Sequence, residues 1–415
     1  MKGKVTALLT ANYDIVKIEK GTIVTPKGFS AAGLHSGVKK QRNDLGAIFC
    51  NVPASVASVY TLNKMQAAPL KVTKESIAKE KKIQAIVVNS GNANACTGKQ
   101  GLEDAYAMRK AAAKKFNIPE HYAAVASTGV IGLQMPMDKI LSGISQLNPE
   151  QTNESAEQFN EAIITTDLVT KSTCYQAQIN GRPVTIAGSA KGSGMIKPNM
   201  ATMLGFVTTD AAIESDILQL ALKEVTDQTF NRITVDGDTS TNDMVTVMAS
   251  GQAENELLHP SHPEWQVFVQ LLRQTCEDLA KMIARDGEGA TKLIEVEVKG
   301  ALNDEDAGKI AKAVVGSPLV KTAVYGTDAN WGRIIAAVGY SEAVIDPESI
   351  HMFVGPIQML RDSQPLPFSE EEATAYLENH EVKFTIDLQI GEGYGKAWGC
   401  DLTYDYVRIN ASYRS

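Results

Sequence analysis

The sequence predicts an α/β (α+β) fold, a layered α/β sandwich in which helices cover mixed or antiparallel sheets. Two observations favour this class. Short β-like runs alternate with amphipathic helical runs along the 415 residues, and one pair of runs has the spacing of a hairpin. A hydrophobic content of 44% with 21% charged residues is ordinary for a globular protein. Hairpins among the helices favour a sandwich over a doubly wound parallel sheet.

The first recognisable elements lie before residue 190. The segment IQAIVV (83–88) predicts a buried strand, and a helix is expected over about 99–116 after a Gly/Asn loop. The segment YQAQINGRPVTIAG (175–188) predicts a hairpin, because Asn180-Gly181 suits a two-residue turn of the primed type.

Two amphipathic helices are expected next. One lies near 215–230, and its predicted apolar face consists of Ile217, Leu220, Ala221 and Val225. The other lies near 264–284, with a stripe formed by Trp265, Phe268, Leu272, Cys276, Leu279 and Ile283. Both stripes are expected to face the core, and neither receives a catalytic role.

The segment RDGEGATK (285–292) predicts a domain junction, because its two glycines end the second helix. Beyond it we expect a strand at 293–298, a helix around 304–315, another after Asn330, and a strand at 404–409. The segment GEGYGKAWG (391–399) lacks the GK[ST] ending of a phosphate loop and predicts a flexible hairpin. The expected domains are residues 1–290, a layered α/β domain, and 291–415, a smaller α/β domain.

Charge and composition exclude several kinds of partner. A formal net charge of −8 offers no basic face to nucleic acid and fits poorly with an anionic membrane. No apolar run approaches the length of a membrane span, and VTALLT (5–10) is too short for a secretory signal. We therefore expect a cytoplasmic protein, or one of an organelle matrix after loss of a transit peptide, without nucleic-acid or membrane partners.

The cysteines and histidines predict neither disulfides nor a metal site. The five cysteines are scattered, odd in number and without a CxxC pair, which indicates buried thiols in a reducing compartment. The six histidines show no metal-ligand spacing. The acidic segment VDGDTSTND (235–243) lacks the length and final Glu of a calcium loop and predicts a turn. We predict no metal and no cofactor.

The segment KGSGMIKPNMATMLG (191–205) offers an activated nucleophile. Its glycines and Pro198 favour an irregular backbone, and small Ala201 leaves its carbonyl open to attack by the hydroxyl of Thr202. Hydrolysis of the resulting ester cuts the chain at 201/202 and leaves Thr202 as a new amino terminus. A terminal threonine carries nucleophile and base on one residue, since an α-amine titrates near pH ~8. Such a nucleophile suits a chain with few histidines.

Nine tags follow one another along the chain. They are TPKGFSAAGLHSG (25–37), VNSGNANACTG (88–98), STGVIG (127–132), TTD (165–167), KGSGMIKPNMATMLGF (191–206), VDGDTSTND (235–243), RDGEGATK (285–292), YGTDANWGRI (325–334) and NASYRS (410–415). Single Gly-rich strings recur by chance, but nine in this order do not. From about Gly21 to its last residue, the chain resembles the ornithine acetyltransferase family, the bifunctional glutamate N-acetyltransferases of cyclic arginine biosynthesis.

This resemblance implies a ping-pong reaction and a set of site residues. Thr202 takes the acetyl group from N2-acetyl-L-ornithine and passes it to L-glutamate. The family pattern places the oxyanion hole at Thr128 and Gly129, after a strand-like run at 123–126. It places substrate contacts at Thr165, Lys191, Thr202, Glu288, Asn410 and Ser415. We expect Glu288 to offset an ammonium, and Lys191 to lie near a carboxylate or the Thr202 amine. The family often ends in Thr, and Ser415 keeps the hydroxyl and the terminal carboxylate.

The resemblance also implies partners. The fragments 1–201 and 202–415 are expected to stay associated, as a heterotetramer of two copies of each. Bifunctional relatives also load the threonine from acetyl-CoA, and no residue decides whether this chain does. Two alternatives stay open at the level of sequence: a self-cleaving amidohydrolase or aminopeptidase that uses Thr202 with water, and an uncut amino-acid-binding protein.

Overall fold

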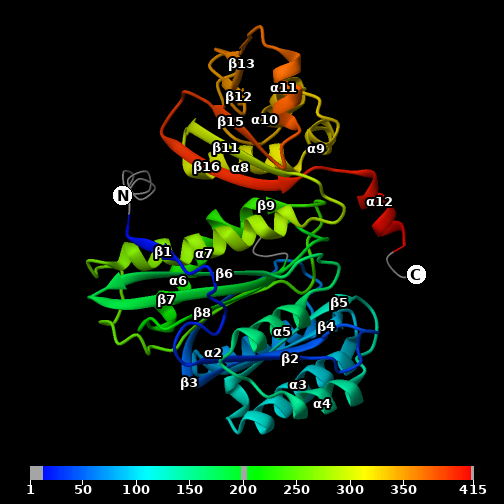
Figure 1. Ribbon diagram of the computed structural model, residues 1–415, viewed down its shortest axis with the longest axis vertical. Helices are drawn as coiled ribbons and strands as arrows, with labels where there is room; N and C mark the ends of the chain where they lie inside the picture. The colour runs from blue at the N-terminus through cyan, green and yellow to red at the C-terminus, as the bar shows by residue number, and fades with distance from the viewer. Residues whose placement is uncertain (1–12, 198–202, 413–415) are drawn as a thin grey trace.

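The computed structural model describes residues 13–197 and 203–412 and contains two β-sheets with helices on and between them (Figure 1). The larger sheet has nine strands. Their order is β1 (Ile15–Lys17), β6 (Lys171–Ile179), β7 (Arg182–Lys191), β8 (Leu204–Thr209), β10 (Met244–Ala249), β3 (Leu45–Tyr60), β4 (Lys82–Asn92) and β5 (Ala123–Val130), with β2 (Phe29–Leu34) paired to β3. The pairs β8–β10 and β4–β5 are parallel and the others antiparallel, so the predicted mixed α/β class is confirmed.

Helices cover both faces of this sheet. They are α2 (Ala68–Glu80), α3 (Gly98–Phe116), α4 (Met137–Gln146), α5 (Asn153–Ile163), α6 (Ser215–Gln228) and α7 (Trp265–Arg285), with short 3₁₀ turns at Glu120–Tyr122 and Phe230–Arg232. Strand β8 shows the two-sided burial. The Phe206 ring packs on Phe159 of α5, with ring centroids 5.7 Å apart, whereas its neighbour Val207 packs in the core beneath α7. Alternating side chains of one strand therefore meet different helices.

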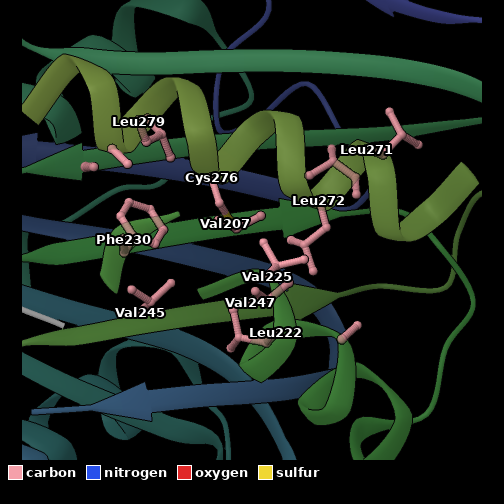
Figure 2. Packing of buried hydrophobic residues seen from close by; sticks show 14 of the residues in the cluster. Val207, Leu222, Val225, Phe230, Val245, Val247, Leu271, Leu272, Cys276 and Leu279 are labelled. Atoms are coloured by element: carbon pink, nitrogen blue, oxygen red, sulfur yellow. The ribbon is translucent and has the colours of Figure 1, made fainter. Parts of the chain in front are cut away.

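The core beneath α6 and α7 is the largest apolar cluster (Figure 2). The predicted stripe of α7 is fully confirmed, since all six of its members are buried. The predicted face of α6 is partly wrong. Leu220 is 60% exposed, and Leu218 and Leu222 point inward instead, with Ala221 and Val225.

The second sheet has seven strands. Their order is β14 (Gln364–Pro365), β13 (Ile357–Arg361), β12 (His351–Val354), β15 (Glu381–Asp387), β11 (Leu293–Ala301), β16 (Gly393–Cys400) and β9 (Ile233–Thr234). The remaining helices are α8 (Asp304–Gly316), α9 (Pro318–Tyr325), α10 (Trp331–Gly339), α11 (Glu370–Leu377) and α12 (Tyr404–Ala411). Strand β9 precedes residue 290 but pairs with β16 of the second sheet. The second sheet therefore contains strands from both sides of the expected domain junction. The division into domains 1–290 and 291–415 stays a prediction.

Two predictions about the carboxyl-terminal region are wrong. The segment 391–399 forms most of β16, an inner strand rather than a flexible hairpin. Its glycines serve a close approach of α8, because a Cβ on Gly395 would lie 2.9 Å from the nitrogen of Gly308. The segment 404–409 is helical, not a strand. Thr403 caps α12 by accepting the N–H groups of Asp405 and Tyr406, and no neighbouring strand pairs with it in the described part of the chain.

Within residues 13–197 and 203–412, no helix has the length and apolar character needed to span a bilayer.

Candidate active site

Six of the predicted site residues line one cavity of about 340 Å³. They are Thr128, Gly129, Thr165, Lys191, Glu288 and Asn410. They come from the end of β5, the loop after α5, the end of β7, the loop after α7 and helix α12. These segments are far apart in the sequence, so the fold brings the predicted residues together. Their chemical roles stay predictions.

The predicted oxyanion residues stand where β5 leaves its parallel partner β4. Gly129 is paired with Gly91 and has a φ of +133°, and a Cβ there would lie 2.3 Å from the carbonyl carbon of Gly91. Glycine is therefore required at 129 for both conformation and space. The Nζ of Lys191 donates to the hydroxyl of Thr128 at 3.5 Å, which links this corner to β7.

A network of buried charged side chains positions Lys191. Its Nζ lies 3.9 Å from Oδ2 of Asp167, and Oδ1 of Asp167 accepts from Lys171 Nζ at 2.7 Å. Lys171 also donates to Asp286 at 2.6 Å and is itself fully buried. Asp167 further accepts the backbone N–H groups of Thr165 and Gly192, at 2.9 Å and 2.7 Å. One carboxylate thereby fixes two segments of the cavity wall.

The charge balance keeps Asp167 ionised. Burial alone raises the pKa of this carboxyl, but Lys191, Lys171 and the hydrogen bonds outweigh it and hold the pKa below its ordinary value. Lys191 therefore lines the cavity with an ionised carboxylate 3.9 Å from its Nζ.

Glu288 lines the same cavity as Lys191, and it is only 8% exposed. Its Oε2 accepts the side-chain amide of Asn410 at 2.8 Å, and its backbone N–H donates to the carbonyl of Ser193 at 3.0 Å. Gly194 makes room for it, since a Cβ there would lie 2.4 Å from the Glu288 carboxylate. An anion and a cation thus line the same cavity, which suits an amino-acid substrate.

Ala201, Thr202 and Ser415 lie outside the described residues. Met203, which follows Thr202 in the chain, lines the cavity, and its carbonyl accepts the N–H of Met244 at 3.0 Å. Strand β8 therefore begins at the cavity wall.

Several residues of the cavity and its supports received no role from the sequence. They are Asp167, Lys171, Asp286, Asn242 and Asp243. The side-chain amide of Asn242 donates to the carbonyls of Ala93 and Ser127, at 2.5 Å and 2.8 Å, and so fixes the end of β5 next to Thr128. The sequence feature that could have indicated four of them is membership of the tags named above, which contain Asp167, Asp286, Asn242 and Asp243. No tag contains Lys171.

No group of three or more His, Cys, Asp or Glu side chains in the described ranges is placed to hold a metal ion. A smaller cavity, of about 70 Å³, lies between α6, α7 and β16 beside Trp398. None of the predicted site residues lines it.

Comparison with known proteins gives one consistent answer. The model of the ArgJ family matches residues 30–415. A relative from Halalkalibacterium halodurans, named arginine biosynthesis bifunctional protein ArgJ, is 66% identical over 407 residues, or 98% of each chain. A protein of the same name from Geobacillus kaustophilus is 62% identical and covers 99% of each chain.

Two solved structures are also similar. The crystal structure of arginine biosynthesis bifunctional protein argJ from Bacillus halodurans is 65% identical, with a TM-score of 0.45, over 45% of this chain and 98% of that one. Ornithine acetyltransferase from Mycobacterium tuberculosis, complexed with ornithine, is 32% identical, with a TM-score of 0.42, over 45% of this chain and 100% of that one. The family match over nearly the whole length and the identity to these curated relatives confirm the resemblance seen in the nine tags: the chain belongs to the ArgJ family.

Proposed function

We propose that this chain is an acetyltransferase of arginine biosynthesis, which moves the acetyl group of N2-acetyl-L-ornithine to L-glutamate. One observation carries the assignment of its site: six residues from five separate segments converge on a single cavity, into whose wall the chain runs directly after Thr202. Membership of the family supports the reaction.

In the proposed mechanism Thr202, freed by cleavage at 201/202, is the nucleophile. Its α-amine takes the hydroxyl proton as Oγ attacks the acetyl carbonyl carbon. The bond between that carbon and the ornithine nitrogen breaks, and the nitrogen takes the proton. Thr128 and Gly129 stabilise the oxyanion that forms in between.

The second half-reaction runs these steps in reverse, with the amine of L-glutamate in place of that of ornithine. The amine of glutamate attacks the acetyl ester, the carbon–oxygen bond to Thr202 breaks, and the proton returns to Oγ. One amide replaces another, so the exchange needs no cofactor. Water must be kept from the ester, because otherwise the enzyme becomes a deacetylase.

Charge supports an assignment of the substrate-binding residues. Glu288, with Asn410 beside it, offsets an ammonium of ornithine, and Lys191 with Thr165 lies near the carboxylate. Ser415 is the further substrate contact that the family resemblance implies. Acetyl-CoA as a further donor, a cytoplasmic location and assembly into a heterotetramer are parts of the same proposal.

Transfer of labelled acetyl tests the function. Wild-type protein is incubated with N2-[¹⁴C]acetyl-L-ornithine, with and without L-glutamate, and N-acetylglutamate, ornithine and free acetate are quantified. We expect label in N-acetylglutamate, little acetate, and no transfer by Thr202→Ala. Label that ends in acetate even when glutamate is present would assign a hydrolase instead. A second arm with acetyl-CoA decides whether it is a donor.

A further inference from the structure

The cavity contains a second buried aspartate whose situation is the opposite of Asp167. Asp243 stands just before β10, is 3% exposed and lines the cavity. Its Oδ2 has no hydrogen-bond partner in the described part of the protein. In that part, it is the one carboxyl oxygen of a buried Asp or Glu side chain left in this state. A buried polar atom without a partner is costly, so it calls for an explanation.

The surroundings of Asp243 favour a neutral acid. The charged groups that share the cavity are Lys191 from β7 and Glu288 from the loop after α7. Lys191 already faces Asp167, and no lysine or arginine forms an ion pair with Asp243 in the described ranges. Burial raises the pKa of Asp243 well above its ordinary value, and the hydroxyls of Ser240 and Thr61 with the charge of Lys191 oppose this only in part. A protonated Oδ2 carries a hydrogen that needs an acceptor.

Asp243 is also close to the proposed reaction centre along the chain. The next residue, Met244, donates its N–H to the carbonyl of Met203, and Met203 follows the proposed nucleophile directly. A carboxylate here would repel a carbonyl or carboxylate oxygen of a substrate bound beside it. A carboxylic acid would donate a hydrogen bond to such an oxygen.

We propose that Asp243 acts as a neutral carboxylic acid whose hydroxyl donates a hydrogen bond to an oxygen of the bound substrate, either the acetyl oxygen or a carboxylate oxygen. The proton stays on Asp243 throughout the cycle, and no bond to it forms or breaks. The identity of the substrate rests on the proposed function, whereas the protonated state of the free protein does not.

Infrared difference spectroscopy at neutral pH tests the protonated state. The wild-type spectrum minus that of Asp243→Asn should contain the carbonyl stretch of a protonated carboxyl, which shifts in protein labelled with [4-¹³C]aspartate. Asp167→Asn is the matched control. Asp167 is a buried aspartate of the same site but is ionised, so the spectrum of this variant should still contain the protonated-carboxyl band. Absence of the band in the free wild-type protein overturns the proposal.

Ligands then identify the acceptor. A shift of the band with L-ornithine alone assigns the carboxylate oxygen, and a shift only with N2-acetyl-L-ornithine assigns the acetyl oxygen. A band that moves with neither ligand, although binding is shown by calorimetry, overturns the proposal. If the wild type fails to transfer acetyl but the band is present and shifts with ornithine, the proposed function fails and the role of Asp243 stands.

Variants separate a neutral donor from a carboxylate. Asp243→Asn keeps a neutral group with a hydrogen to donate, so kcat/KM should fall by about 10-fold or less, whereas Asp243→Ala should lose about 100-fold. If Asn is as damaging as Ala in a folded, cleaved protein, the group works as a carboxylate and the proposal is wrong. Should the Ala variant not fold, the wild-type spectra still decide.

Discussion

At the scale of single residues, the site depends on buried charges that balance one another. Lys171 lies between Asp167 and Asp286, and none of the three reaches solvent appreciably. Removing one partner of a buried pair leaves the other charge uncompensated, which costs far more than the loss of an exposed pair. The same carboxylate that supports Lys191 therefore also stabilises the fold.

Asp167→Asn should lower the free energy of unfolding by about 3–5 kcal/mol at neutral pH. The folded-state pKa of Asp167 lies below the unfolded one, so its contribution is fully present above the unfolded pKa of about 4 and declines as the pH falls below it. Urea unfolding should therefore show a gap between wild type and variant that narrows below pH ~4. Asp216→Asn, which breaks the exposed pair with Lys81, is the control and should change stability by less than about 1 kcal/mol. A gap that stays constant down to pH 2.5 would contradict this account.

Variants at Gly129 and Gly132 distinguish the effect of a steric clash from the effect of a positive φ. Both have positive φ, +133° and +83°, but a Cβ at 129 meets the backbone of Gly91 and one at 132 meets nothing within 4 Å. Gly129→Ala must displace the proposed oxyanion donor, so kcat should fall by about 10²–10³-fold. Gly132→Ala should lose about 1–2 kcal/mol of stability and keep a kcat close to that of the wild type. Steady-state kinetics and thermal unfolding measure both, and equal losses of kcat would refute the distinction.

At the scale of elements, sequence patterns succeed where local chemistry decides the structure. The α7 stripe follows the helical period and is buried as expected, and Asn180 and Gly181 both have positive φ, as a primed turn requires. The pattern fails for β16 and α12. Glycines in β16 are required by the approach of α8, and α12 is exposed and capped, which its aromatic and β-branched residues do not reveal.

The candidate site divides in the same way. The family resemblance carried by the tags assigned roles to six of the residues that line the cavity, because each tag is a local string that can be matched position by position. The pairing of Lys171 with Asp286, across 115 residues, depends on β6 and α7 lying side by side, and no local pattern encodes that. Supports behind a site are therefore harder to predict than the residues that line it.

Helix α12 presents Asn410 to Glu288, and its first turn fixes where it lies. The Thr403 hydroxyl donates to the carbonyl of Gly289, 2.7 Å away, and accepts from the N–H groups of Asp405 and Tyr406. The helix buries none of its own residues, so it is held by this cap and by a few contacts, such as that of the Tyr404 ring with Tyr325, whose centroids lie 5.9 Å apart.

Thr403→Ala should therefore raise KM for N2-acetyl-L-ornithine with little change in kcat, and remove about 1 kcal/mol of helix stability. Ser369→Ala is the matched control. It removes the equivalent cap of α11, whose residues do not line the cavity, and should leave KM unchanged. Deletion of 410–415 should raise KM more strongly than either. A normal KM in both Thr403→Ala and the deletion would refute the placement of α12 at the substrate.

At the scale of the whole molecule, the larger sheet mixes strands from both sides of the proposed cut. The two strands that follow residue 201, β8 and β10, lie in the middle of this sheet. The strands on either side of them precede residue 201: β1, β6 and β7 towards one edge, and β3, β4 and β5 towards the other. Two strand pairs, β7–β8 and β3–β10, therefore join the fragments, and the cores on both sheet faces contain side chains from each. Cleavage at 201/202 breaks one covalent bond and leaves this pairing in place.

Each fragment should consequently depend on the other for its fold. Native mass spectrometry of wild-type protein should give one complex that contains both 1–201 and 202–415, and denaturing electrophoresis should split it into two bands. Thr202→Ala should give the same native assembly and one denatured band. Residues 1–201 expressed alone lack the two central strands, so they would expose the inner edges of β7 and β3 and should aggregate, whereas coexpression with 202–415 should rescue them. A soluble, folded 1–201 fragment on its own, or separation of the two pieces under native conditions, would refute this interdependence.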